Sequence, residues 1–202
     1  MNLVLDCVVT GQDIQYPINI HMCKSNKLIK LDYILFDEHN ETNYSRIIKP
    51  TNFKYNQVCY GITKEILNDQ GVNIEEVLDH LETIIDNVMY IISYYSDHVS
   101  KILLVEALRT NRMKLYNKLI SKKFICIVLT SNRVFDTDLS LSEICDELNV
   151  SWLEPSLTRK VLNCYKEMKR RKYKIVMYRE LKGPTVLSYS HHEKLKKCKS
   201  NS

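Results

Sequence analysis

The side chains best suited to bind a ligand are the cations of the segment Lys166–Lys174 (KEMKRRKYK), where Lys169, Arg170, Arg171, Lys172 and Lys174 lie close together. Ammonium and guanidinium groups bind phosphate oxygens through charge-assisted hydrogen bonds. On a helix these cations would spread around much of the circumference and form a basic knob instead of a narrow stripe. The segment therefore predicts phosphate contact. A nuclear-import-like signal and a solvated helix end that complements the helix dipole stay open as alternatives.

The charge of the whole chain is distributed unevenly. From Arg159 onward there are 14 Lys and Arg against three Glu, whereas the preceding 158 residues hold 15 basic and 21 acidic groups. The formal net charge of +5 therefore combines an acidic body with a basic C-terminal region. Such asymmetry favours a polyanionic partner, of which nucleic acid is the commonest, because each neutralised phosphate releases condensed counterions.

Three tyrosines follow the apolar run Val88–Ser93 or lie within it, at Tyr90, Tyr94 and Tyr95. Aromatic rings stack on unpaired bases, so Tyr94 and Tyr95 are candidate contacts for single-stranded nucleic acid. Tyrosines at strand ends also pack against their neighbours in ordinary cores. Both roles remain open from the sequence.

The seven cysteines are scattered, without a CxxC pair or a Cys–His cluster at zinc spacing, at Cys7, Cys23, Cys59, Cys126, Cys145, Cys164 and Cys198. We interpret them as small buried hydrophobic residues in a reducing compartment, instead of a disulfide framework or a metal site. The pair His191-His192 is weak evidence for a metal site for the same reason, since only one distant cysteine accompanies it.

The length of 202 residues fits one domain, and a hydrophobic content of 45% is enough for a sizeable core. The first residues, MNLVLDCVV, lack a basic start and hold an acid inside the apolar run, so they do not predict a secretory signal. No apolar run approaches the length needed to span a bilayer. We therefore expect an intracellular protein, in the cytoplasm or nucleus, without membrane contact.

Apolar runs and helical periodicities predict the elements of the chain. Strands are expected at Met1–Val9, Ile18–Met22, Ile29–Asp37, Ser45–Lys49, Val88–Ser93 and Phe124–Thr130. Helices are expected after Thr63 as N-cap and over Ile74–Asn87, Asp97–Leu108, Leu139–Leu148 and Ser156–Tyr173. Early strands followed by strand–helix alternation predict an α/β fold, in which helices flank a mixed sheet.

The C-terminal segment carries two more strand-like runs, Lys174–Tyr178 and Thr185–Tyr189, which predict a small hairpin or an addition to a sheet edge. We therefore divide the chain into a domain over residues 1–173 and an appendage with a basic tail over residues 174–202. Such an appendage is a natural docking surface for a protein partner.

The order of several segments resembles the DnaQ-type (DEDD) 3′–5′ exonucleases of the ribonuclease-H-like superfamily. Leu3–Gly11 (LVLDCVVTG) is similar to the first motif, commonly LDTETTG, and Tyr60–Thr63 (YGIT) to the HGIT segment. Ile92–Val99 (ISYYSDHV), with the helix that continues to Leu103 and Glu106, is similar to the VAHNxxFD segment. Phe124–Thr130 is placed like the strand that usually ends in Cys-Thr, and Leu139–Cys145 (LSLSEIC) is similar to LSLxxLC. The helix from Leu157 is placed like the closing helix of the family. The resemblance implies a ribonuclease-H-like fold over most of the chain.

The resemblance also implies a two-metal site that this chain lacks in large part. Such enzymes hold two divalent ions with acidic side chains to cleave a phosphodiester. Asp6 matches one of the four family acids, but the other three positions hold Val8, Val99 and Leu157, and Trp152 stands where the general-base histidine belongs.

Neighbouring residues are weak surrogates for the missing ligands. Asp97 and His98 adjoin Val99, and Asp13 lies just past the first motif. Each is explained as simply by a solvated loop or, for Asp97, by a cap on the following helix.

The sequence thus predicts a catalytically degenerate exonuclease-like protein without a required cofactor, acting as a non-catalytic accessory subunit that binds DNA, RNA or a replication or transcription protein. A divergent nuclease using Mg²⁺ or Mn²⁺ at Asp6 is the first alternative, and a pure protein-interaction scaffold is the second.

Overall fold

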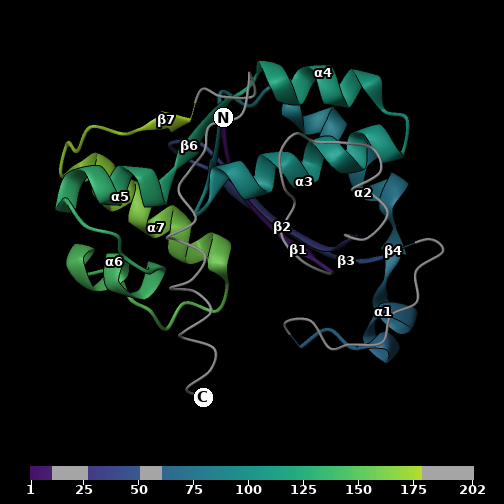
Figure 1. Cartoon of the computed structure of the whole chain (residues 1–202), viewed down its shortest axis with the longest axis horizontal. Coiled ribbons are helices and arrows are strands. Elements are labelled where there is room, and N and C mark those ends of the chain that lie inside the picture. The colour runs from purple at the N-terminus through teal and green to yellow at the C-terminus, as the bar shows by residue number, and fades with distance from the viewer. Residues whose placement is uncertain (11–26, 51–60, 179–202) are drawn as a thin grey trace.

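The computed structural model describes residues 1–10, 27–50 and 61–178, which form a mixed sheet flanked by helices (Figure 1). The sheet contains seven strands in the order β4-β3-β2-β1-β5-β6-β7. These strands are β1 (Asn2–Val9), β2 (Leu28–Phe36), β3 (Glu41–Lys49), β4 (Val72–Asn73), β5 (Tyr90–Ser93), β6 (Lys123–Cys126) and β7 (Met177–Tyr178). The predicted α/β class is confirmed.

Strand directions divide the sheet into two parts. β1, β2 and β3 form an antiparallel meander, in which Leu5 lies opposite Tyr33 and Tyr33 lies opposite Tyr44. β5 and β6 run parallel to β1, and β7 returns antiparallel to β6 at the edge. β1 therefore lies at the centre, between the antiparallel and the parallel part.

The helices connect the parallel strands and cover both faces of the sheet. They are α1 (Lys64–Gln70), α2 (Ile74–Ile85), α3 (Ser96–Arg109), α4 (Met113–Ser121), α5 (Ile127–Phe135), α6 (Leu141–Leu148) and α7 (Leu157–Arg170). Thr63 caps α1, as predicted; Ser156 also caps α7, and Ser140 forms a capping box with Glu143 at α6.

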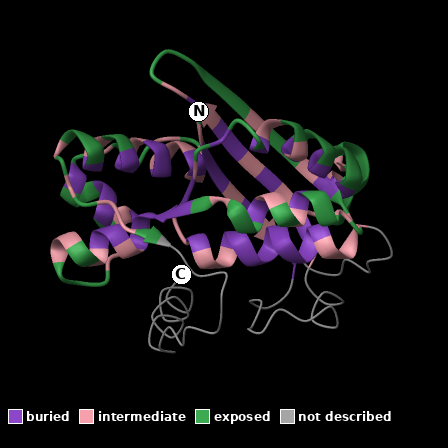
Figure 2. Ribbon diagram, turned by 90° about the horizontal axis from the view of Figure 1, so that it is seen from above, coloured by how far each residue is buried: buried purple, intermediate pink, exposed green. Residues whose placement is uncertain are grey.

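Alternation along the strands fills two separate cores (Figure 2). On β1, Leu3 and Leu5 point into the core beneath α2, α3 and α4, while Val4 points into the core beneath α5, α6 and α7. The buried positions of α2 and α7 fall at helical spacing, so each of these helices presents one apolar face to the sheet.

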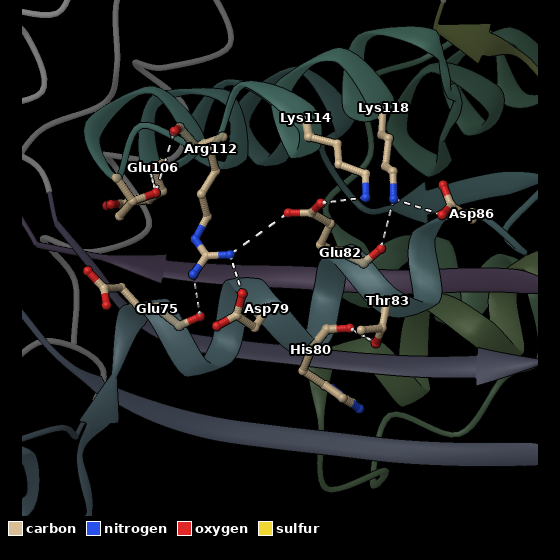
Figure 3. A network of polar contacts seen from close by, with 12 residues as sticks. Glu75, Asp79, His80, Glu82, Thr83, Asp86, Glu106, Arg112, Lys114 and Lys118 are labelled. Carbon is tan, nitrogen blue, oxygen red and sulfur yellow. Dashed lines mark hydrogen bonds and ion pairs between the residues drawn. The ribbon is translucent and has the colours of Figure 1, made fainter.

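Ion pairs join α4 to α2 on the outer surface of the layer formed by α2, α3 and α4 (Figure 3). Arg112 pairs with Asp79 and also donates to the backbone carbonyl of Glu75 at 3.2 Å. Lys118 binds Asp86 at 2.7 Å and the carbonyl of Glu82 at 3.2 Å. These contacts fix the crossing of two helices whose buried residues fill the same core.

We expect Arg112→Ala to lower the free energy of unfolding by about 1 kcal/mol, because it removes both a carboxylate and a carbonyl contact between α2 and α4. Urea denaturation followed by circular dichroism measures the change. Lys114→Ala is the matched control, since the Lys114 side chain is 77% exposed and lies 3.6 Å from Glu82. An equal loss of unfolding free energy in both variants would contradict a stabilising role for the Arg112 contacts.

One element prediction was wrong, and one helix was missed. The run Phe124–Thr130 is a strand only as far as Cys126, and Ile127 begins α5. The turn is fixed by two bonds, from the Val128 amide to the Tyr94 carbonyl and from Thr130 Oγ1 to the Cys126 carbonyl. Helix α4 was not predicted at all, although Leu115 and Leu119 face the core at helical spacing. Apolar runs this short do not distinguish a strand from a buried helix.

The C-terminal run Lys174–Tyr178 contributes β7, which adds to the sheet edge beside β6. The predicted strands at Ile18–Met22 and Thr185–Tyr189 lie outside the described residues. Among the helices that the structure describes, none is long and apolar enough to cross a membrane.

Candidate functional site

Asp6 belongs to a small polar cluster on the sheet face that carries α7. In the antiparallel register Asp6 lies directly opposite Asp32 of β2, so their side chains share one face. Asp32 binds Lys30 Nζ at 2.6 Å through one oxygen and accepts a hydrogen bond from Ser45 Oγ at 2.5 Å through the other. Three adjacent strands thus bring two carboxylates, an ammonium and a hydroxyl together.

The two carboxylates of this cluster differ in their surroundings. Burial raises the pKa of Asp6 to about 7, and the neighbouring charge of Asp32 adds to the increase, while the Cys7 amide and Lys30 oppose it. Asp32 has the direct cationic partner in Lys30. A proton therefore occupies Asp6 for much of the time near neutral pH, and any bound cation must displace that proton.

The positions where the resemblance expects further acids lie in three different apolar clusters. Val8 packs with Ile29 and the start of α1, and Val99 is 2% exposed in the core beneath α2 and α3. Leu157 packs against the core on the opposite face of the sheet. These side chains supply no oxygen ligand.

Asp97 and His98 lie in the first turn of α3. Asp97 forms an ion pair with Lys101 at 2.5 Å, one helical turn further on. The N-cap position is Tyr95, whose side chain makes no capping hydrogen bond, so the expected cap at Asp97 is not present. Residues 1–10, 27–50 and 61–178 contain no group of three or more His, Cys, Asp or Glu side chains that could hold a metal ion. Asp13 lies outside these residues.

The tyrosines near β5 are integrated into the body of the protein. Tyr94 packs against the core beneath α6, its hydroxyl donates to the Leu139 carbonyl at 3.5 Å, and burial raises its pKa to about 12. Tyr90 packs against the same core, and Tyr95 is half-buried at the start of α3. This geometry fits packing better than base stacking for Tyr94.

The predicted phosphate-binding cations fall into two groups. Lys169, Lys172 and Lys174 are exposed at the C-terminal end of α7 and just beyond it. Arg170 is exposed but makes a two-pronged contact with Glu167, both bonds being 2.7 Å. Arg171 also binds Glu167 and donates to the carbonyls of Glu147 at 3.1 Å and Leu148 at 2.8 Å. Arg171 therefore closes the C-terminal end of α6.

We expect Arg171→Ala to lower the melting temperature by about 2–4 °C, because it leaves terminal carbonyls of α6 without this donor. Differential scanning calorimetry gives the comparison. Lys169→Ala serves as the control, since it removes a neighbouring exposed cation without touching α6. A melting temperature unchanged by Arg171→Ala would show that solvent satisfies those carbonyls equally well.

Four cysteines lie within the described residues, and all four are buried with free thiols, as predicted: Cys7, Cys126, Cys145 and Cys164. Cys145 of α6 and Cys164 of α7 are in contact, with their sulfur atoms 3.6 Å apart. Burial raises the pKa of both thiols, which makes them poor nucleophiles.

Glu106 is a buried acid whose role was not predicted beyond its place in the resemblance. It is 3% exposed, accepts a hydrogen bond from the Leu28 amide at 2.9 Å and binds Arg109 at 2.5 Å. Burial raises its pKa, against the opposing effects of Arg109 and the Leu28 amide. Glu106 lines a hollow of about 160 Å³ between the sheet and the ends of α2 and α3. Its bonds assign it a structural role.

Comparisons with known proteins found no match that would indicate a function. No protein-family model matches the chain. No significant relative was found among curated proteins either.

Proposed function

We propose that this chain is a catalytically degenerate member of the DnaQ-like exonucleases that binds nucleic acid without cleaving it. The antiparallel β3-β2-β1 meander followed by parallel β5 and β6 is compatible with a ribonuclease-H-like arrangement. In that arrangement Asp6 stands on the central strand, on the face covered by α7. The sequence similarities described above follow the same order along the sheet and helices.

The apolar side chains of Val8, Val99 and Leu157, each packed in an apolar cluster, carry the proposal of lost catalysis. Two divalent ions need several oxygen ligands around one position. Asp6 has Asp32 as its carboxylate neighbour, and Lys30 already neutralises that neighbour. The residues present therefore do not fit a two-metal centre.

Binding is supported by the concentration of exposed cations at the end of α7. Lys169, Lys172 and Lys174 are exposed there, next to a body with an acidic balance of charge. Contacts of lysine with phosphate release counterions, so they produce salt-dependent affinity without sequence preference. A replication or transcription assembly would use such a subunit to hold a strand near the active enzyme.

A second candidate is a divergent metal-dependent nuclease. The observation in its favour is the adjacency of Asp6 and Asp32 on neighbouring strands, since two carboxylates can ligate a single Mg²⁺ or Mn²⁺.

A titration with labelled oligonucleotides separates these functions. Single-stranded and duplex DNA and RNA are mixed with the full chain between 50 and 200 mM salt, with and without Mg²⁺ or Mn²⁺, and anisotropy and strand length are followed. We expect salt-dependent binding and intact strands. Substituting Lys169, Lys172 and Lys174 together by Gln should lower the affinity and reduce the slope of log affinity against log salt by about two to three.

The matched control is Lys114→Gln, an exposed lysine on α4 whose loss should leave the salt slope unchanged. Metal-dependent shortening of the strand that Asp6→Asn abolishes would overturn the proposal in favour of the nuclease. Absence of binding to all four nucleic acids would favour a protein-interaction scaffold.

A further inference from the structure

The connection between α6 and α7, residues 149–156, exposes two large apolar side chains. Trp152 is 44% exposed and Leu153 is 92% exposed, which makes Leu153 the most exposed large hydrophobic residue in the described part of the chain. Figure 1 shows that this connection runs along the outside of the layer formed by α6 and α7. Exposed aromatic and aliphatic side chains at one place are a common mark of a contact surface.

The connection is anchored at both ends. Val150 donates to the Cys145 carbonyl at 2.8 Å, and Ser156 caps α7 by accepting from the Arg159 amide at 3.2 Å. Between these points, Glu154 accepts from Asn163 at 3.4 Å. Trp152 is therefore presented on a backbone that is tied to both helices, which reduces the entropy lost when the ring binds a ligand.

A cation accompanies the exposed indole. Lys160 Nζ lies 3.7 Å from the centre of the Trp152 ring, in a cation–π contact. Helix α7 carries Arg159, Lys160, Lys166, Lys169 and Arg170 against the single acid Glu167. Arg159 and Lys166 both bind Glu41 of β3, so this side of α7 keeps an excess of positive charge.

We propose that Trp152 stacks on an unpaired base of single-stranded nucleic acid while Lys160 binds an adjacent phosphate. The proposal rests on the proposed function and assigns a stacking residue and a strand preference to it. A partly exposed indole with a flexible cation over its ring suits a ligand that has both a base face and a phosphate. A duplex buries its base faces, so it can use the cations but not the indole. An apolar peptide would use the indole but would gain nothing from the cations.

The chain holds a single tryptophan, so fluorescence excited beyond the absorption of its 13 tyrosines reports on this position alone. Titration of the full chain with a single-stranded oligonucleotide should quench the fluorescence, with the midpoint that anisotropy of a labelled strand gives. Duplex of the same length should bind with little quenching. Trp152→Ala should weaken single-strand binding about 5- to 100-fold, and Trp152→Phe should retain most of the affinity.

Two further variants sharpen the result. Lys160→Gln should reduce the salt slope by about one, because one phosphate contact is lost. Leu153→Ser removes the neighbouring, more exposed apolar side chain and should leave nucleic-acid affinity unchanged. Circular dichroism of each variant establishes that the fold is retained.

The outcomes separate this inference from the function on which it rests. Full-strength single-strand binding that leaves the fluorescence unchanged and survives Trp152→Ala would overturn the stacking inference alone. Equal quenching by duplex and single strand would overturn the strand preference. Absence of binding in the anisotropy measurement would overturn the proposed function and the inference together, and would point to a protein ligand for Trp152 and Leu153.

Discussion

Replacing Asp6 by Asn is expected to stabilise the folded protein at neutral and alkaline pH. In the folded state burial beside Asp32 raises the pKa of Asp6 from an ordinary value of 3.8 to about 7. The folded state therefore binds a proton more tightly than the unfolded state, and its stability falls as the pH rises from about 4 to about 7. Above pH 7 the penalty is complete, and linkage sets it at up to about 4 kcal/mol.

Urea unfolding at pH 5 and pH 8 tests this expectation. The Asn variant should exceed the parent protein at pH 8 by more than at pH 5, because an amide carries no charge to bury. Asp32→Asn is the matched control: it removes the acceptor of Lys30 and Ser45 and should not produce a stability gain of this size.

A loss of stability at pH 8 from Asp6→Asn would mean that the charged carboxylate has a favourable partner. Repeating the measurement with Mg²⁺ and Mn²⁺ would then identify it, since a cation bound at Asp6 stabilises only the parent protein. If neither ion changes the stability of the parent protein, and Asp6→Asn gives the expected gain at pH 8, Asp6 no longer serves as a metal ligand.

Replacing Glu106 by Ala is expected to cost about 3–5 kcal/mol of folding free energy, because it removes one member of a buried ion pair. Glu106 joins the C-terminal half of α3 to the first residue of β2, 78 positions away in the sequence. Loss of the carboxylate removes the acceptor of the Leu28 amide and one ion-pair partner of the half-buried Arg109. Thermal and urea unfolding of the variant measure the cost.

Glu106→Gln separates the contribution of the hydrogen bond from that of the ion pair. The amide oxygen can still accept from the Leu28 amide but cannot neutralise Arg109, so an intermediate loss of about 1–3 kcal/mol is expected. Equal losses in the Ala and Gln variants would assign the effect to the ion pair alone. A loss below 1 kcal/mol in the Ala variant would show that water reaches the site and replaces the carboxylate.

The fold was predictable where local chemistry and periodicity agree. The caps at Thr63, Ser140 and Ser156 and the apolar face of α2 all follow from the residue order. The boundary at Cys126 was not predictable, because the same apolar run continues from β6 into α5 and the change is marked by hydrogen bonds, one of them to the distant Tyr94 carbonyl. Patterns of burial do not report such tertiary bonds.

The candidate site was less predictable, because its members meet through register and packing. Asp32 lies opposite Asp6 only in the observed pairing of β1 with β2, and a shift of one residue would place the two on opposite faces. In the sequence Arg171 is one of several equivalent cations, but in the structure it binds two carbonyls at the end of α6. Trp152 could have been singled out as the only tryptophan, beside a leucine in a polar connection.

The central position of β1 in the sheet determines the order in which the protein can fold during synthesis. Its antiparallel neighbour β2 follows closely, but its parallel neighbour β5 begins at Tyr90, and α7, which covers one face, begins only at Leu157. Long-range pairings of this kind fold slowly and leave apolar surface open in the meantime. During synthesis, the cover over the face that bears Val4 and Ile34 is not complete until α7, the last helix of the described residues, has left the ribosome. A truncated product that ends before α7 should therefore be a substrate for chaperones and proteases, however well its first strands have paired.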